Sequence, residues 1–352
     1  MKKINIIYLL PAMKKISGGA KVIYNHSKLL NNLDPNLNST VNHLKKNTRY
    51  KIKTSILKKL RFLQPKFSGL QGNKMKVLKN FYPNKKWISF KINSGKSLNF
   101  NNHTDFIIIP EIWAHFAEDM KFRQKKINYA IFVQGFFHMN STDNFLKLKR
   151  SYKNSTFILS DSEYSIKCIK EMFPEFIDKI IKLSFSIDHK KFKIRKKINL
   201  ITYMPRKLPD HAFLLLFYLK NLLPKNWKIC PLININQNKL IATLAKSKIF
   251  LSFSNFEGIG MPPIEAALSG NRVIGYKGGG GAEYWKSKIF KKIESGEIRD
   301  FGKVILQEIK NYKISWLKET MSERMKLAKQ YSKTKEIKSL KYLIKKIQLA
   351  MM

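Results

Sequence analysis

Two glutamates and two glycines stand close together in the second half of the chain, within residues 254–270. Glu257 precedes Gly258 and Gly260, and Glu265 follows after seven intervening residues. Glycines let backbone amides approach a ligand closely, and a helix expected from Pro262 points its unpaired N–H groups at the same place. A carboxylate in the first turn of that helix, such as Glu265, accepts hydrogen bonds from a vicinal diol such as a ribose. The stretch therefore predicts a nucleotide-binding site.

Strand and helix signals alternate along both halves of the chain. Apolar runs followed by loop residues predict buried parallel strands at 4–10, 106–109, 129–133, 157–159, 198–203, 227–229, 249–253 and 272–275. Helical spacing predicts helices beginning near Val22, from 208 to 223, from 262 to 268, and from 333 to 350. The length of 352 residues favours two domains. We expect two α/β domains, at 1–190 and 198–330, and a C-terminal helix at 333–352.

The pattern E-G-x-G-x-P-P-x-E-A, from Glu257 to Ala266, resembles the retaining GT-B glycosyltransferases of family 4. The following strand and glycine loop, Val273 to Tyr284, is similar to the same family. The resemblance implies two Rossmann-like domains that face each other across a cleft. It places a nucleotide-sugar donor on the second domain and the acceptor on the first. It also implies that the last helix crosses back to the first domain.

The resemblance implies roles for individual residues around the donor. Glu265 would hold the ribose, and Glu257 with the Gly258 and Gly260 amides would orient the sugar and phosphates. Lys207, helped by Arg206, would neutralise the leaving diphosphate. Fixed cations there stabilise the transition state more than the ground state, because negative charge grows on the leaving group.

Weaker matches lie in the first half. Ser17-Gly18-Gly19 resembles the family's N-terminal glycine turn, and its Gly18 and Gly19 would face the diphosphate. Gln134 stands where many relatives have a histidine, and His138 follows four residues later. At His138 an acceptor-side role and an ordinary loop histidine both stay open.

The formal net charge is +45, from 68 Lys and Arg against 23 Asp and Glu. Such a charge suits polyanionic partners, but lysine enrichment across the whole surface accounts for it equally well. A basic amphipathic segment at 49–66 fits either an anionic membrane surface or packing on the first sheet. No zinc-finger, basic-zipper or RNA-recognition pattern accompanies the charge, which disfavours nucleic acid. The sequence also contains no Asp-x-Asp motif, so we expect no metal and no cofactor.

We therefore expect a retaining, metal-independent glycosyltransferase that transfers a sugar to a glycan or lipid-linked acceptor in cell-surface polysaccharide synthesis. We expect it in the cytoplasm, or peripherally on the inner face of the membrane. Three alternatives remain: a nucleotide-sugar epimerase, a glycan phosphorylase, and a basic nucleic-acid-binding protein.

Overall fold

The computed structural model describes residues 3–13, 17–46, 75–77, 95, 97–140 and 144–352. The basic segment 49–66 lies outside the described residues. The chain divides into two compact units: Met1–Ser184 with Ile337–Met352, and Phe185–Glu336. In the described part of the chain, no helix is long and apolar enough to cross a membrane.

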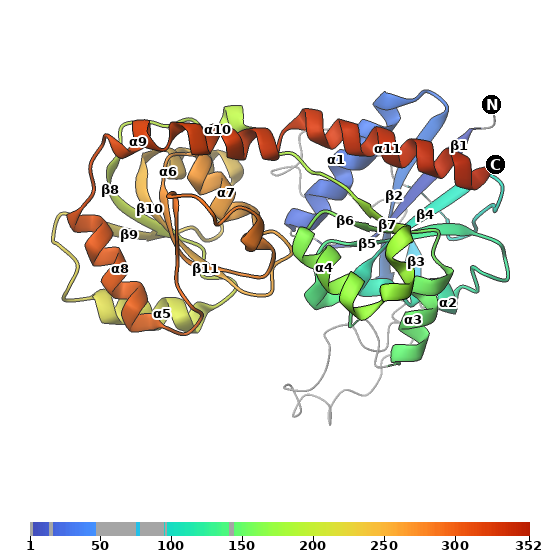
Figure 1. Cartoon of the computed structure of the whole chain (residues 1–352), viewed down its shortest axis with the longest axis horizontal. Helices are drawn as coiled ribbons and strands as arrows, with labels where there is room; N and C mark the ends of the chain where they lie inside the picture. Colours follow the sequence, from blue (N-terminus) through green and yellow to red (C-terminus); the bar gives the residue numbers. More distant parts are fainter. Residues whose placement is uncertain (1–2, 14–16, 47–74, 78–94, 96, 141–143) are drawn as a thin grey trace. The chain divides into compact units, whose positions relative to one another are not determined.

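The first unit is built on a seven-stranded sheet in the order β3-β2-β1-β4-β5-β6-β7 (Figure 1). Only β3 runs antiparallel to its neighbour among the pairs described. The strands are β1 (Ile4–Pro11), β2 (Leu37–Lys46), β3 (Met75–Val77), β4 (Asp105–Pro110), β5 (Asn128–Val133), β6 (Phe157–Ser160) and β7 (Ile180–Lys182). Every residue of β4 is buried, as the continuous apolar run predicts for a central parallel strand.

Helices flank this sheet, and the C-terminal helix returns to it. The helices are α1 (Gly18–Leu33), α2 (Phe116–Asp119), α3 (Phe145–Asn154), α4 (Glu163–Met172) and α11 (Lys333–Met351). Leu340, Leu343 and Ile347 on α11 are fully buried. The Gln348 side chain also donates a hydrogen bond to Asp34, the C-cap of α1, which fixes the last turns of the chain on the first unit.

The second unit has a fully parallel five-stranded sheet in the order β12-β11-β10-β8-β9. Its strands are β8 (Ile198–Tyr203), β9 (Lys228–Pro231), β10 (Ser247–Ser254), β11 (Arg272–Lys277) and β12 (Phe290–Lys292). Its helices are α5 (Pro209–Leu219), α6 (Gln237–Lys246), α7 (Met261–Leu268), α8 (Ile298–Lys310), α9 (Trp316–Glu319) and α10 (Met321–Gln330). Figure 1 shows α5 and α8 on one side of this sheet and α6 and α7 on the other.

A buried lysine joins the ends of two of these helices. The Lys197 ammonium donates hydrogen bonds to the carbonyls of Ser247 (2.8 Å) and Ser269 (2.6 Å), which are the C-caps of α6 and α7. A cation at a helix C-terminus satisfies carbonyls that the helix leaves open. Burial lowers the pKa of Lys197 to about 7.

The sequence patterns located most strands but missed or misjudged several elements. The pattern predicted neither β2 nor α6, and it extended α5 to Leu223, although this helix ends at Leu219. Beyond Leu219 the chain makes turns in which the Leu222 and Leu223 amides both bond to the Leu219 carbonyl. The predicted end of α5 was therefore too late, because apolar residues continue at helical spacing after the backbone has left the helix.

Candidate functional site

The second sheet changes direction between β8 and β10. From β8 the chain crosses to β9 on one side, and it then returns past β8 to β10, β11 and β12 on the other. In open parallel sheets such a switch point leaves a crevice beyond the carboxyl ends of the two strands, where ligands bind. The loops that follow β8 and β10 carry the strongest site candidates from the sequence. Topology alone therefore directs attention to the same residues as the motif.

Lys207 and Glu257 meet at this switch point. Lys207 follows β8 and Glu257 follows β10, and Lys207 Nζ lies 3.1 Å from Glu257 Oε1. The side chains are 28% and 26% exposed, so a ligand can reach both. Arg206, beside Lys207, is more exposed. The structure thus brings together Lys207, which the resemblance assigns to the diphosphate, and Glu257, which it assigns to the donor sugar and phosphates.

Two donors on the next loop hold the glycine loop in shape. The Tyr284 hydroxyl shares its proton between the carbonyls of Ile259 (2.9 Å) and Gly260 (2.8 Å), and the Gly280 amide donates to the Glu257 carbonyl (3.1 Å). These bonds fix the backbone of the loop that carries Glu257. Burial raises the pKa of Tyr284, which keeps its hydroxyl a donor at neutral pH.

Glycine at position 280 is required by packing. A Cβ atom there would lie 1.1 Å from the Gly258 carbonyl oxygen. The two glycine loops, after β10 and after β11, therefore touch backbone to backbone. This contact explains why the run of glycines at 278–281 accompanies the Glu257 motif.

Helix α7 begins differently from the sequence expectation. It starts at Met261, after Gly260 in a left-handed conformation with φ of 79°, so Glu265 is its fifth residue and no acid lies in the first turn. The expectation that Glu265 lies in the first turn is wrong, because the left-handed glycine lets the helix start one residue earlier. Pro262 and Pro263 lack N–H groups, which reduces the amides at this helix start. Anion contacts here would depend on the loop amides and Met261.

Phe256, immediately before Glu257, has a strained backbone. Its φ is 49°, a left-handed conformation that a bulky residue rarely adopts, and it is 58% exposed. Such strain persists where the surrounding structure imposes it, and it is often found at functional sites. The backbone conformation at Phe256 determines the direction of the loop that follows β10 and carries Glu257.

The glycines of the first unit lie inside a helix rather than in a turn before it. Helix α1 begins at Gly18, and the Ser17 hydroxyl accepts a hydrogen bond from the Ala20 amide as N-cap. The sequence expectation of a Ser17-Gly18-Gly19 turn followed by a later helix is therefore wrong. A serine N-cap starts a helix even when glycines follow it, since the capping bond satisfies an otherwise open amide. Gly18 and Gly19 occupy the first turn of α1, where amides have no intrahelical partner.

Gln134 contacts this helix start directly. Its side-chain amide donates to the Gly19 carbonyl (3.2 Å), and a Cβ atom on Gly19 would lie 2.6 Å from Gln134 Oε1. Two of the predicted residues of the first half are thus neighbours, and a larger residue at position 19 would require the Gln134 side chain to move. His138 lies at the exposed end of a 3-10 helix, Phe136–His138.

A buried carboxyl group beside Gln134 was not predicted from the sequence. Glu111 follows β4, is 5% exposed, and its carboxyl accepts hydrogen bonds from the Gln134 and Gly135 amides. Burial raises the pKa of Glu111 from 4.5 to about 7, although the backbone hydrogen bonds oppose this shift. The signal was its position directly after Pro110, at the end of a fully apolar strand. Since the first sheet switches direction between β1 and β4, Glu111 stands at that sheet's own switch point.

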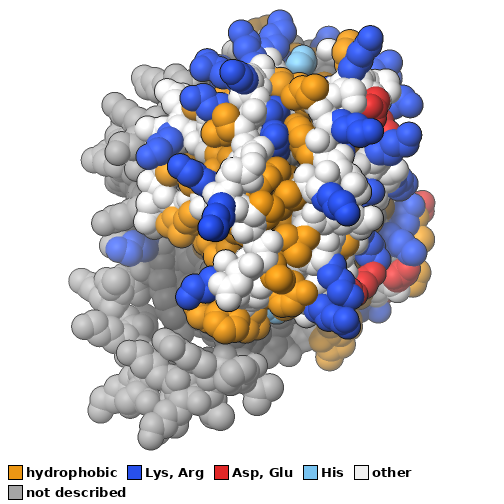
Figure 2. All heavy atoms as spheres, turned by 90° about the vertical axis from the view of Figure 1, so that its left-hand side faces the viewer, with side chains coloured by type: hydrophobic (Ala, Val, Ile, Leu, Met, Phe, Trp, Pro, Cys, Tyr) orange, Lys and Arg blue, Asp and Glu red, His pale blue; other side chains and the backbone are white. Residues whose placement is uncertain are grey.

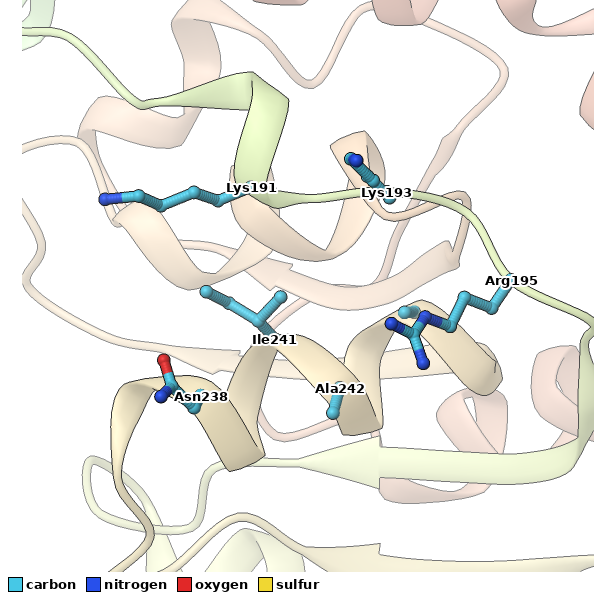
Figure 3. A pocket seen from close by; sticks show the side chains of 7 residues that line it. Lys191, Lys193, Arg195, Asn238, Ile241 and Ala242 are labelled. Atoms are coloured by element: carbon cyan, nitrogen blue, oxygen red, sulfur yellow. The ribbon is translucent and has the colours of Figure 1, made fainter.

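The structure also holds a shallow pocket away from these strand ends. It has a volume of about 180 Å³ and is lined by three cations and one face of α6: Lys191, Lys193, Arg195, Asn238, Ile241, Ala242 and Ala245 (Figure 3). Arg195 is tied to α6 through its amide, which donates to the Ala245 carbonyl. None of the predicted site residues lines it. Among the residues placed by the structure, no group of three His, Cys, Asp or Glu side chains is suited to a metal ion.

Comparison with solved structures identifies the fold. A glycosyltransferase from Rickettsia africae has a TM-score of 0.65 at 14% identity, with 99% of each chain covered. A mutant of S. aureus TarM, crystallised with fondaparinux, α-GlcNAc-glycerol and UDP, has a TM-score of 0.61 at 13% identity over 100% of both chains. Anabaena Alr3699/HepE, crystallised with UDP, has a TM-score of 0.64 at 10% identity, covering 99% of this chain and 100% of its own.

These matches give the class of architecture: two Rossmann-like α/β units with the GT-B fold of glycosyltransferases. The predicted fold class is confirmed. No protein-family model and no curated protein sequence matches the chain.

Proposed function

We propose that this protein is a glycosyltransferase that uses a nucleoside-diphosphate sugar as donor. The observation that carries the proposal is the Lys207–Glu257 pair at the switch point of the second sheet, beside a glycine loop whose carbonyls are bonded elsewhere. A diphosphate is bound by cations and backbone amides, and sugar hydroxyls are bound by a carboxylate. Groups of all three kinds follow β8 and β10 at this switch point.

Each residue has a distinct role in the proposed reaction. Lys207, with Arg206 nearby, neutralises the diphosphate as the bond to the sugar breaks, which lowers the barrier by electrostatic stabilisation. Glu265 binds the ribose, and Glu257 holds the sugar hydroxyls. The Gly258 and Gly260 amides face the phosphates. In the first unit, Gly18, Gly19 and Gln134 form the corresponding strand-end site, with His138 nearby in sequence.

The proposed transfer retains the anomeric configuration, as the resemblance to family 4 implies, and needs no metal ion, as the lack of an Asp-x-Asp motif suggests. Lys207 and the loop amides supply the positive charge that a metal would otherwise provide. The acceptor class we propose is a glycan or a lipid-linked sugar in cell-surface polysaccharide synthesis. The proposal draws support from the UDP complexes of the TarM mutant and of HepE.

A direct test measures binding and turnover with the full chain. Thermal shift with UDP, GDP, ADP and their sugars should show stabilisation by one nucleotide family, since a ligand stabilises the state that binds it. With that donor, nucleotide release should require an acceptor and should continue in EDTA. Donor conversion without acceptor would instead indicate an epimerase. Phosphate-dependent glycan cleavage would indicate a phosphorylase, and polynucleotide binding with no nucleotide-sugar binding would contradict the proposal.

A further inference from the structure

Helix α5 exposes an apolar face in addition to the one it buries. Phe213 and Phe217 are 69% and 71% exposed, and Leu214 between them is 50% exposed. The two phenylalanines are four residues apart, so their side chains are neighbours on one side of the helix, and Leu214 borders them. Together these three residues define the α5 face.

The α5 face is not needed for the core of the second unit. Ala212, Leu215 and Leu219, on the opposite side of the helix, are buried and provide the contact with the sheet. A helix at the surface of a water-soluble domain normally has polar residues on its outer side. A cluster of large apolar side chains at the surface marks an interaction site.

Basic residues border the α5 face. Lys220 follows Phe217 by three residues and lies on the same side of the helix, Lys225 lies in the connection to β9, and Lys228 is the first residue of β9. All three lysines are exposed. One exposed acid, Asp210, also lies on this side, three residues before Phe213, and it is the only acidic residue within 209–228. The three lysines outnumber it. Figure 2, which shows one side of the molecule, has hydrophobic patches bordered by Lys and Arg, with few acidic side chains.

The charges around the α5 face favour one of three kinds of partner: a second copy of the chain, a nucleic acid or an anionic bilayer. A second copy of the chain would bring like charges together, because the net charge is +45. A single-stranded nucleic acid stacks its bases on aromatic rings within a basic groove, whereas Phe213, Leu214 and Phe217 lie on the outer side of a helix and include an aliphatic side chain on which a base does not stack. An anionic bilayer provides acyl chains for the apolar side chains and phosphate groups for the lysines at once.

We propose that the α5 face docks on the surface of an anionic lipid bilayer. Phe213, Leu214 and Phe217 enter the boundary between headgroups and acyl chains, and Lys220 remains at the level of the phosphates. The proposal goes beyond the glycosyl transfer proposed above and does not depend on it, since none of these residues belongs to the Lys207–Glu257 site. It would give a transferase access to a membrane-borne acceptor.

The test is vesicle co-sedimentation of the full chain. Vesicles of phosphatidylcholine alone are compared with vesicles that also contain phosphatidylglycerol, at low and high salt. A Phe213→Ser/Phe217→Ser variant removes the anchors. The matched control is Met321→Ser/Met325→Ser, because these two methionines on α10 are also four residues apart and are 56% and 62% exposed. Nucleotide binding of every variant is measured in parallel, which separates loss of docking from loss of the donor site.

We expect the parent protein and the methionine variant to bind the phosphatidylglycerol vesicles equally. The phenylalanine variant should bind about tenfold more weakly, and Lys220→Glu should weaken the salt-sensitive part of the binding, which Lys225 and Lys228 still support. Equal binding by the phenylalanine variant overturns the proposal, as does indifference of the parent to lipid charge. Dimerisation or RNA binding that is lost in the phenylalanine variant, without vesicle binding by the parent, assigns the face to another partner and also overturns it.

Discussion

Lys207 Nζ and Glu257 Oε1 lie 3.1 Å apart, so a cation and a carboxylate form an ion pair where the chain leaves β8 and β10. Both side chains are partly exposed, so water weakens the attraction between them. If the proposed donor binds here, its diphosphate would compete with Glu257 for the lysine. We expect a phosphate to replace the carboxylate as the partner of Lys207.

This exchange predicts opposite effects for the two partners on product binding. Glu257→Gln should bind the free nucleoside diphosphate a few-fold more tightly, because Lys207 loses its competitor, while kcat falls. Lys207→Met should bind the same ligand about tenfold more weakly, consistent with loss of a charge-assisted hydrogen bond. Titration calorimetry measures both. Lys292→Met, which breaks the pair with Glu294 elsewhere, serves as control and should bind like the parent. Equal weakening in both site variants would exclude the exchange.

Glu265 should contribute to affinity rather than to turnover. Glu265→Ala should weaken nucleotide binding about tenfold or more, since a carboxylate that accepts two ribose hydroxyls is lost. Glu294→Ala removes an exposed glutamate of the same unit and should leave binding unchanged. A panel of UDP, GDP and ADP measured by calorimetry checks this. Parental affinity of Glu265→Ala for every nucleotide would refute the ribose role.

The hydroxyl of Tyr284 should matter more than that of Tyr312. Tyr284→Phe removes the proton that the hydroxyl shares between two carbonyls of the glycine loop, and it should lower the free energy of unfolding by about 1–3 kcal/mol, with weaker nucleotide binding. Among the residues that the structure describes, the buried Tyr312 hydroxyl has no hydrogen-bond partner, so Tyr312→Phe should be neutral or stabilising. Chemical denaturation compares the two. Because both variants keep the ring, a destabilisation of equal size would mean that the hydrogen bonds to the loop contribute no stability of their own.

The left-handed backbone at Phe256 should cost stability. Phe256→Asn should raise the free energy of unfolding by about 1 kcal/mol, because asparagine tolerates this conformation better. If the phenylalanine ring contributes to the site, the same variant should lose kcat/KM. Thermal unfolding and initial rates test the two effects separately. A lower melting temperature would show that ring contacts outweigh the strain.

Glu111 should make stability depend on pH in a defined direction. Its pKa is raised by burial from 4.5 to about 7, so the folded state binds this proton more tightly than the unfolded state does. The resulting stabilisation is complete below pH 4.5 and is lost as pH rises through about 7, by about 3 kcal/mol in total. Glu111→Gln should lack this dependence. A parent and variant whose melting temperatures change in parallel between pH 4.5 and 7.5 would contradict the assignment.

Much of the fold could be predicted, and a candidate donor site could be located, because the local signals were strong and consistent. Buried parallel strands give continuous apolar runs, and the motif from Glu257 to Ala266 combines glycines, prolines and acids in a fixed order. The start of α7 could not be placed, since nothing in the sequence states that Gly260 adopts a positive φ. The start of α1 was missed because the Ser17 cap outweighs the low helix propensity of Gly18 and Gly19.

Glu111 was missed because its position after Pro110, at the end of an apolar strand, becomes distinctive only in its tertiary context. A single glutamate after a proline has no distinctive spacing, and only the adjacency of β1, β4 and β5 brings it to the Gln134 amide. The α5 face was hidden for a similar reason. A run of leucines and phenylalanines is typical of a buried core. Only the fold shows which of these side chains are exposed to solvent, such as Phe213 and Phe217.

The buried position of Lys197 also separates this side chain from the many other lysines of the chain. Its amine lies against the carbonyls of Ser247 and Ser269, out of reach of reagents dissolved in water, while exposed lysines acylate readily. Acylation of Lys197 therefore requires local unfolding that breaks its hydrogen bonds to Ser247 and Ser269. The rate at which mass spectrometry detects this acylation in the intact chain would measure how often the second unit unfolds around Lys197.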